Sequence, residues 1–274
     1  MVDRNHEGME GKTLDGTVLL DVRGDVAIVT LNRSEALNAL NDDLGRELLS
    51  ALRECGRTHV RAVVLTGSGR AFCAGGDLRF FRGFAAQDPA RPFRELAGVL
   101  NDIIMALRSL AKPVIAAVNG ATGGAGVSLA CACDLRFAAR GAIFRQAYTA
   151  AGLTPDGAWT LLVPLLTGLG RASELLFLNP VLKAEQALEY GLVNRVVEDG
   201  ELMEHCLGTA RELAAGPTQA FGRAKELFNR ALFSGLYAQL ELERQGITAS
   251  AGTADYQEGL AAFLEKRSPV FGGR

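Results

Sequence analysis

Two glycine-rich runs carry the residues of this chain best suited to chemistry. The first covers residues 70–77 (RAFCAGGD) and the second residues 119–126 (NGATGGAG). Each follows an apolar run, residues 63–66 and 114–118, that predicts a buried strand. A strand that ends in glycines leaves backbone N–H groups uncovered, because no side chain blocks them. Two such ends side by side in an α/β fold can direct two N–H groups at one carbonyl oxygen and stabilise an enolate or oxyanion. The pattern indicates an enzyme.

Three carboxylates are candidates for acid/base chemistry. Asp77 follows the first glycine run and Asp134 follows an apolar helical run, and we expect each to cap a helix or fix a loop. Asp156 lies in the apolar segment 151–159 (AGLTPDGAW), which contains no Lys or Arg. Its position after a proline and before a predicted helix favours an N-cap. An apolar pocket would instead raise the pKa of this carboxyl, which suits an acid/base group, and the local sequence leaves both roles open.

The sequence argues against several other kinds of site. Its histidines, His6, His59 and His205, adjoin no nucleophile motif, so we expect no Ser-His-Asp or Cys-His arrangement. Ser128 is outside any GxSxG motif, and residues 67–70 (GSGR) lack the spacing of a phosphate-binding loop. No group of His, Cys or carboxylates has the spacing of metal ligands, so we expect no metal.

Composition limits the possible partners and compartment. The chain has 274 residues, 48% of them hydrophobic, and a formal net charge of −2 without a basic stripe, so we expect no nucleic-acid binding. The longest apolar stretch, residues 114–133, is interrupted by Asn119 and several glycines, so we expect no membrane span. The five cysteines form no CxxC pair, which indicates reduced core thiols and a cytoplasmic protein. Residues 1–14 have charges but no apolar core, and we expect a flexible tail there.

Periodicity predicts an α/β core over residues 15–199 and a helical region over residues 200–274. In the core we expect a hairpin over 17–31, strands at 61–67, 114–118, 134–138, 142–144 and 192–197, and helices at 41–55, 93–110, 124–132, 156–167, 170–178 and from 183. Residues 80–94 read as an irregular surface loop. In the helical region we expect amphipathic helices over 201–214, 218–233, 236–249 and 255–265.

Several long motifs in register resemble those of the crotonase superfamily, the enoyl-CoA hydratase/isomerase family. They are residues 31–40 (LNRSEALNAL), 65–77 (LTGSGRAFCAGGD), 112–120 (KPVIAAVNG) and 184–193 (AEQALEYGLV). The resemblance covers residues 18–271 in order, and residues 255–269 are also similar to the ring-epoxide phenylacetyl-CoA isomerases of that family. It implies an α/β crotonase (ClpP-like) spiral of ββα units with a C-terminal helical trimerisation region.

The resemblance also implies a ligand and a set of site residues. The ligand is an acyl-CoA thioester whose CoA is part of the substrate, so no separate cofactor is expected, and the assembly is a homotrimer or hexamer. The N–H groups of Gly76 and Ala125 form the oxyanion hole. Substrate-binding positions fall on Ala36, Ala74, Gly75, Asp77, Leu78, Gly124, Ser128 and Tyr148. Phe263 and Lys266 fall near the CoA site of a neighbouring subunit, with Lys266 facing a phosphate.

The catalytic positions of the family favour isomerisation over hydration. The hydratases place one catalytic Glu where this chain has Ser128 and a second where it has Tyr148, whereas Asp156 matches the single Asp of the isomerases. We therefore expect double-bond isomerisation with Asp156 as proton shuttle. The alternatives are an enoyl-CoA hydratase that uses Asp156 with help from Ser128 or Tyr148, and a non-catalytic CoA-binding member of the family.

The sequence does not decide which acyl group the substrate carries. Five aromatic side chains can either line a pocket for the acyl group or pack in the core: Phe80, Phe81, Phe84, Tyr148 and Trp159.

Overall fold

The computed structural model describes residues 16–56, 59–84 and 88–274. The flexible tail expected over residues 1–14 lies outside the described residues. Within the described ranges, no helix combines the length and apolar character that a membrane crossing requires.

The described residues form two sheets. The larger has the order β1-β2-β3-β5-β7-β10, and the smaller has the order β4-β6-β8-β9. The strands of the larger sheet are β1 (Val18–Arg23), β2 (Val26–Leu31), β3 (Ala62–Gly67), β5 (Val114–Val118), β7 (Leu135–Ala139) and β10 (Arg195–Val197). Those of the smaller sheet are β4 (Ala71–Cys73), β6 (Ala121–Gly123), β8 (Ile143–Arg145) and β9 (Leu182–Lys183). β1 pairs antiparallel with β2, and the other neighbours in the larger sheet are parallel.

Successive strands alternate between the two sheets, and this alternation makes the spiral. β3, β5 and β7 belong to the larger sheet, and each is followed directly by β4, β6 or β8 in the smaller one. A helical segment then leads to the next turn. Both β3 and β5 are buried along their whole length, as expected for parallel strands covered on two faces. The fold is thus the crotonase spiral of ββα units.

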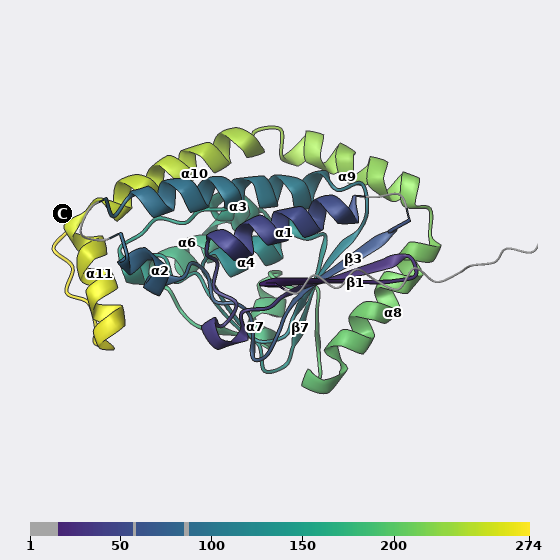
Figure 1. The fold of residues 1–274 in the computed structure, drawn as a ribbon, viewed down its shortest axis with the longest axis horizontal. Coiled ribbons are helices and arrows are strands. Elements are labelled where there is room, and N and C mark those ends of the chain that lie inside the picture. Colours follow the sequence, from purple (N-terminus) through teal and green to yellow (C-terminus); the bar gives the residue numbers. More distant parts are fainter. Residues whose placement is uncertain (1–15, 57–58, 85–87) are drawn as a thin grey trace, which may run out of the picture.

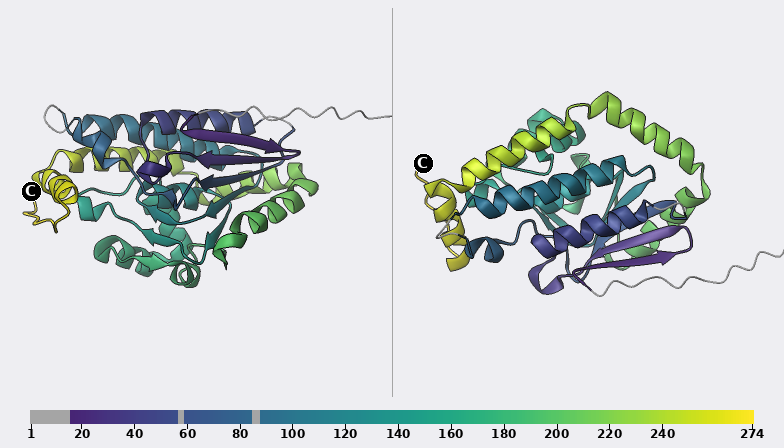
Figure 2. Two further views of the ribbon diagram at one scale, coloured as in Figure 1. Left: turned by 60° about the horizontal axis from the view of Figure 1, so that its bottom comes forward. Right: turned by 45° about the horizontal axis from the view of Figure 1, so that its top comes forward.

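Helices cover both faces of the larger sheet (Figures 1 and 2). In the spiral they are α1 (Asp42–Cys55), α2 (Leu78–Arg82), α3 (Arg91–Ser109), α4 (Ala125–Ala132), α5 (Trp159–Thr167), α6 (Leu169–Leu178) and α7 (Ala184–Glu189), with short 3₁₀ turns at Ser34–Ala36, Thr149–Ala151 and Asp199–Glu201. The C-terminal helices are α8 (Leu202–Ala215), α9 (Thr218–Leu232), α10 (Leu236–Ala251) and α11 (Ala254–Glu265). α10 packs along α3, and α3 packs along α1, whereas α8 covers the opposite face of the sheet.

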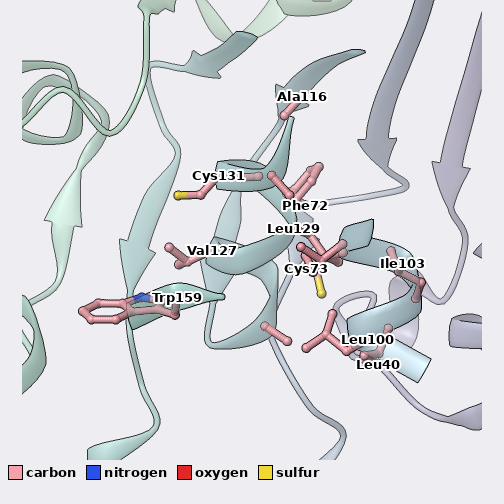
Figure 3. Close-up of a cluster of buried hydrophobic side chains, with 14 of the residues drawn as sticks. Leu40, Phe72, Cys73, Leu100, Ile103, Ala116, Val127, Leu129, Cys131 and Trp159 are labelled. Atoms are coloured by element: carbon pink, nitrogen blue, oxygen red, sulfur yellow. The ribbon is translucent and has the colours of Figure 1, made fainter. Parts of the chain in front are cut away.

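The alternation of side chains along β3 shows how the core divides. Val63 and Leu65 face the main core with α1 and α3, while Ala62 and Val64 face a smaller cluster under α8. Figure 3 shows part of the main core, in which Phe72, Cys73 and Leu129 lie close together. All five cysteines are buried and free, and burial raises the pKa of the Cys73 thiol to about 11. These thiols act as small uncharged core side chains.

Some predicted elements differ from the structure. Residues 80–94 were expected to be irregular, but α2 begins at Leu78 and α3 begins at Arg91. The helix expected from Asp156 begins only at Trp159. The short strands β4, β6 and β9 were not predicted, and they pair across the spiral. The four C-terminal helices lie within a few residues of their predicted bounds, whereas the division into domains at residue 200 stays a prediction.

Candidate active site

The two glycine-rich loops meet at one edge of the smaller sheet. β4 and β6 are parallel neighbours, so their carboxyl ends lie together. Gly75 has φ +101 and Gly124 has φ +47, backbone conformations that favour glycine. A Cβ atom on Gly75 would lie 3.0 Å from the carbonyl oxygen of Gly123, and one on Gly124 would lie 3.6 Å from the Cα of Gly75. The loops are therefore in direct contact, with no room for a side chain between them.

Two backbone N–H groups at this junction are available to a ligand. Ala125 is the first residue of α4, so its N–H has no partner within the helix. Gly76 follows Gly75 in the other loop. Neither N–H donates a hydrogen bond to a group of the described residues, and both residues line the same cavity. Two donors without a protein partner on one cavity are what a site that stabilises an oxyanion requires.

The cavity next to these groups is small and mainly apolar, with a volume of about 100 Å³. Its glycine-rich edge consists of Ala74, Gly75, Gly76, Leu78, Gly124 and Ala125, and its apolar wall includes Leu40, Phe81, Phe93, Leu96, Ala97, Leu100, Ala151, Leu153 and Ile247. Asp156 supplies the one carboxyl group among the described lining residues, and Tyr148 lies beside it. Trp159 packs in the core instead, and Phe80 and Phe84 are not among the lining residues.

The carboxyl of Asp156 is buried, with 7% of the residue exposed. The hydroxyl of Tyr148 donates to its Oδ1 atom at 2.7 Å. Burial raises the pKa of Asp156 from 3.8 to about 6, while the Tyr148 hydrogen bond opposes this shift. A carboxyl with this pKa is ionised at neutral pH and still returns a proton readily, which suits a group that both takes and gives one.

The side chains of Ser128 and Tyr148 both form hydrogen bonds with Asp156. Ser128, fully buried on α4, donates from Oγ to the carbonyl oxygen of Asp156 at 2.8 Å. Its Oγ also lies 3.4 Å from the hydroxyl of Tyr148. At Gly157, which has φ +66, a Cβ atom would lie 2.9 Å from the Cβ of Ser128. The close approach of α4 therefore fixes the backbone that presents Asp156.

Asp156 does not cap the helix that follows it, so the N-cap that its local sequence favours is wrong. N–H groups at the start of α5 donate instead to the side chain of Glu243, a residue of α10. The carboxylate of Glu243 accepts from the N–H of Ala158 at 2.5 Å, from the N–H of Thr160 at 2.8 Å, and from the Thr160 hydroxyl. Sequence reasoning missed Glu243. Its signal was a lone carboxylate on the otherwise apolar stripe of α10, between Leu240 and Ile247.

The other two carboxylates that the sequence analysis considered, Asp77 and Asp134, have structural partners, as their sequence context predicts. Asp77 caps α2, accepting from the N–H groups of Arg79 and Phe80 at 3.0 and 3.2 Å. It also forms an ion pair with Arg33 at 3.0 Å, and it is not among the residues that line the cavity. Asp134 forms ion pairs with Arg108 and Lys225.

Five predicted substrate-binding residues are not among those that line the cavity of this protomer: Asp77 and Ser128, described above, and Ala36, Phe263 and Lys266. Ala36 lies in the 3₁₀ turn that follows β2 and is partly buried. Phe263 lies near the end of α11 with 58% exposure, and Lys266 follows as the C-cap of this helix with φ +55. Contacts from these two residues to a neighbouring subunit stay a prediction.

Comparison with known proteins gives the family. The profile of the enoyl-CoA hydratase/isomerase family matches residues 21–274. The chain belongs to this family. It is 41% identical to the 1,2-epoxyphenylacetyl-CoA isomerase of Escherichia coli K12, over 94% of this chain and 98% of that protein. It is 37% identical to a short-chain-enoyl-CoA hydratase of Clostridium acetobutylicum, over 91% of this chain and 95% of that protein.

Solved structures of the enoyl-CoA hydratase/isomerase family have the same fold. An enoyl-CoA hydratase from Mycobacterium avium subsp. paratuberculosis superposes with a TM-score of 0.85 at 30% identity, covering 93% of this chain and 98% of that one. The curated relatives include both isomerases and hydratases. The chain is therefore an enzyme of the crotonase superfamily, and an acyl-CoA substrate is consistent with that family.

Proposed function

We propose that this protein is an acyl-CoA isomerase that moves a double bond by a 1,3-proton shift. Asp156 is the proton shuttle, and the N–H groups of Gly76 and Ala125 polarise the thioester carbonyl. The observation that carries the proposal is one buried carboxyl, held by Tyr148, in a cavity that also contains two unpaired backbone donors. CoA enters as part of the substrate, and no further cofactor is needed.

The proposed reaction needs a single base. The ionised Asp156 takes a proton from one carbon of the acyl chain, and the electron pair moves into the thioester to form an enolate. The negative oxygen is stabilised by Gly76 and Ala125, and a lost donor of this kind costs about 3–4 kcal/mol in comparable sites. The protonated Asp156 then returns the proton two carbons away, and the double bond has moved.

Hydration is the alternative, and the hydrogen bonds around Asp156 favour isomerisation. A hydratase needs a group that holds and deprotonates water and usually a second group for the α-proton. The hydroxyls of Ser128 and Tyr148, at the positions of the hydratase carboxylates, are both bonded to Asp156. These two hydroxyls hold one acid/base residue, Asp156, and neither supplies a second base.

The name of the Escherichia coli relative adds a ring-epoxide thioester to the substrates worth testing, because the cavity wall is aromatic and aliphatic.

We also propose a homotrimer or a dimer of trimers built through the C-terminal helices. Apolar side chains on α9 stand exposed in one protomer: Leu227, Phe228 and Leu232, with 66%, 62% and 55% exposure. Such a surface favours association. In this assembly Phe263 and Lys266 would serve the CoA site of a neighbouring subunit.

The Asp156→Asn variant tests the proposed function. The amide keeps an oxygen that accepts from Tyr148 but cannot take a proton, so turnover of enoyl-CoA thioesters should fall below detection while calorimetric binding of acyl-CoA persists. Asp102→Asn, at an exposed carboxylate on α3, is the matched control and should behave as wild type. Near-normal turnover of the Asp156 variant would overturn the proposed mechanism. A wild-type protein that binds acyl-CoA without exchanging deuterium at carbon 2 or 4 would support the non-catalytic alternative.

A further inference from the structure

Asp156 lies just before the N-terminus of α5, where an Asp side chain would ordinarily cap the helix. A helix begins with N–H groups that lack partners, and an Asp just ahead of it normally supplies the accepting oxygen. The positive end of the helix dipole also attracts a carboxylate. Asp156 stands three residues before Trp159, the first residue of α5, yet its carboxyl accepts from Tyr148 and faces the cavity.

Glu243, rather than Asp156, accepts hydrogen bonds at the start of α5. Its two oxygens accept from the N–H groups of Ala158 and Thr160, and the Thr160 hydroxyl adds a third hydrogen bond. Glu243 is 5% exposed and reaches α5 from α10, which also supplies Ile247 to the cavity wall. The donors that would draw Asp156 away from the cavity are therefore already satisfied.

We propose that Glu243 is a positioning residue that caps α5 in place of Asp156 and so keeps the Asp156 carboxyl free in the cavity. This inference rests on the proposed role of Asp156 as proton shuttle. Glu243 itself lies outside the lining of the cavity among the described residues, so it acts through Asp156 and not on the substrate.

The charges around Glu243 are few, which makes its effect on Asp156 measurable. Burial raises the pKa of Glu243 to about 7, the Thr160 hydrogen bonds oppose this, and the charge of Asp156 adds to the rise. Burial raises the pKa of Tyr148, and the charges of Asp156 and, least, of Glu243 add to this rise. On α10 itself, Arg244 pairs with Glu241 at the surface. From α3 the polar side chain packed against α10 is that of Asn101, which donates to the carbonyl oxygen of Leu240.

Removing the negative cap should lower the pKa of Asp156. A Gln at position 243 has one accepting oxygen where the carboxylate has two, so an N–H at the start of α5 loses its partner. The Asp156 carboxylate can then turn toward that N–H, and hydrogen bonding to the charged form lowers its pKa. A carboxylate drawn to the helix is also misplaced for proton transfer.

The experiment compares Glu243→Gln with Glu241→Gln, which changes a half-buried carboxylate on the same helix. In the full-length assembly, the pKa of Asp156 is measured by NMR of ¹³C-labelled carboxyl groups, and the acid limb of kcat/KM is measured alongside. For Glu243→Gln we expect both to move down by about one pH unit or more, with kcat reduced about tenfold and KM within about twofold. Glu241→Gln should match wild type.

Thr160 provides a second pair of variants in case Glu243→Gln does not fold. Thr160→Val removes the hydroxyl whose hydrogen bond lowers the pKa of Glu243, so Glu243 is protonated more often and has one good accepting oxygen fewer for the N–H groups of α5. The variant should therefore shift the Asp156 titration in the same direction as Glu243→Gln, and Thr160→Ser should keep the wild-type titration. An unchanged Asp156 pKa and unchanged kcat in these variants, with Asp156→Asn inactive, would overturn the positioning role alone. An active Asp156→Asn variant would instead overturn the proposed function.

Discussion

The Asp156→Asn variant should be more stable than wild type at alkaline pH. In the folded protein the Asp156 carboxyl is buried in an apolar cavity, and its pKa is raised to about 6. The folded state therefore holds the proton more tightly than the unfolded chain. Above pH 6 the folded protein must accommodate a buried charge, and below pH 4 both states are protonated, so the cost of this group appears as pH rises.

The size of the effect follows from the shift in pKa. A rise from 3.8 to about 6 corresponds to about 3 kcal/mol of destabilisation at pH 8, since one unit is about 1.4 kcal/mol. At pH 5 the same linkage leaves about half of this cost. An Asn keeps an oxygen for the Tyr148 hydroxyl and has no charge to bury. We therefore expect the variant to gain stability over wild type between pH 5 and pH 8, with a gain that is about 1 kcal/mol larger at pH 8 than at pH 5.

Chemical unfolding measures this difference directly. The chain has a single tryptophan, Trp159, which is 2% exposed and lies three residues from Asp156, so its fluorescence reports unfolding at this site. Wild type, Asp156→Asn and the exposed control Asp102→Asn are unfolded in urea at pH 5 and pH 8, at one fixed protein concentration because the protein is proposed to assemble. A stability difference between Asp156→Asn and wild type that does not depend on pH would refute the reasoning that the carboxyl is buried with a raised pKa.

Four further predictions concern the neighbours of Asp156 and the assembly. Tyr148→Phe removes a hydrogen bond that lowers the pKa of Asp156, so the acid limb of kcat/KM should move to higher pH; a shift to lower pH would contradict this. Ser128→Ala should reduce kcat less than about tenfold, because a lost hydrogen bond to the Asp156 carbonyl costs about 1 kcal/mol; a large loss with unchanged acyl-CoA binding would favour the hydratase alternative. Light scattering should give three or six times the 29.1 kDa chain mass rather than a monomer. Lys266→Ala should weaken CoA binding, and an unaltered affinity would remove the proposed phosphate contact.

Much of the fold was predictable because its signals are local. The fully buried strands β3 and β5 read as continuous apolar runs, and the C-terminal helices show their periodicity in the sequence. The strands β4 and β6, of three residues each, are too short to show a period. They form because the spiral places them side by side, and that pairing is a property of the tertiary structure.

The contact between the two glycine-rich loops could be predicted from the sequence, whereas the hydrogen bonds around Asp156 could not. The glycines at Gly75 and Gly124 mark the contact between the two loops, because their conformations exclude other residues. The local pattern around Asp156 could not decide between a cap and an acid/base group. That choice depends on Glu243, which lies 85 residues beyond Ala158 in the chain and caps the helix from α10. A capping partner this distant leaves no local signal beside the helix that it serves.

One measurement tests the single-carboxylate isomerase most directly: the fate of oxygen and hydrogen labels during turnover. Enoyl-CoA thioesters, with the double bond at carbon 2 or carbon 3, are incubated with the enzyme in ¹⁸O-water and separately in deuterium oxide. The account predicts that the double bond migrates with no ¹⁸O in the product, and that deuterium exchange at carbons 2 and 4 disappears in Asp156→Asn. Incorporation of ¹⁸O into a hydroxyacyl product at a rate that matches turnover would contradict it.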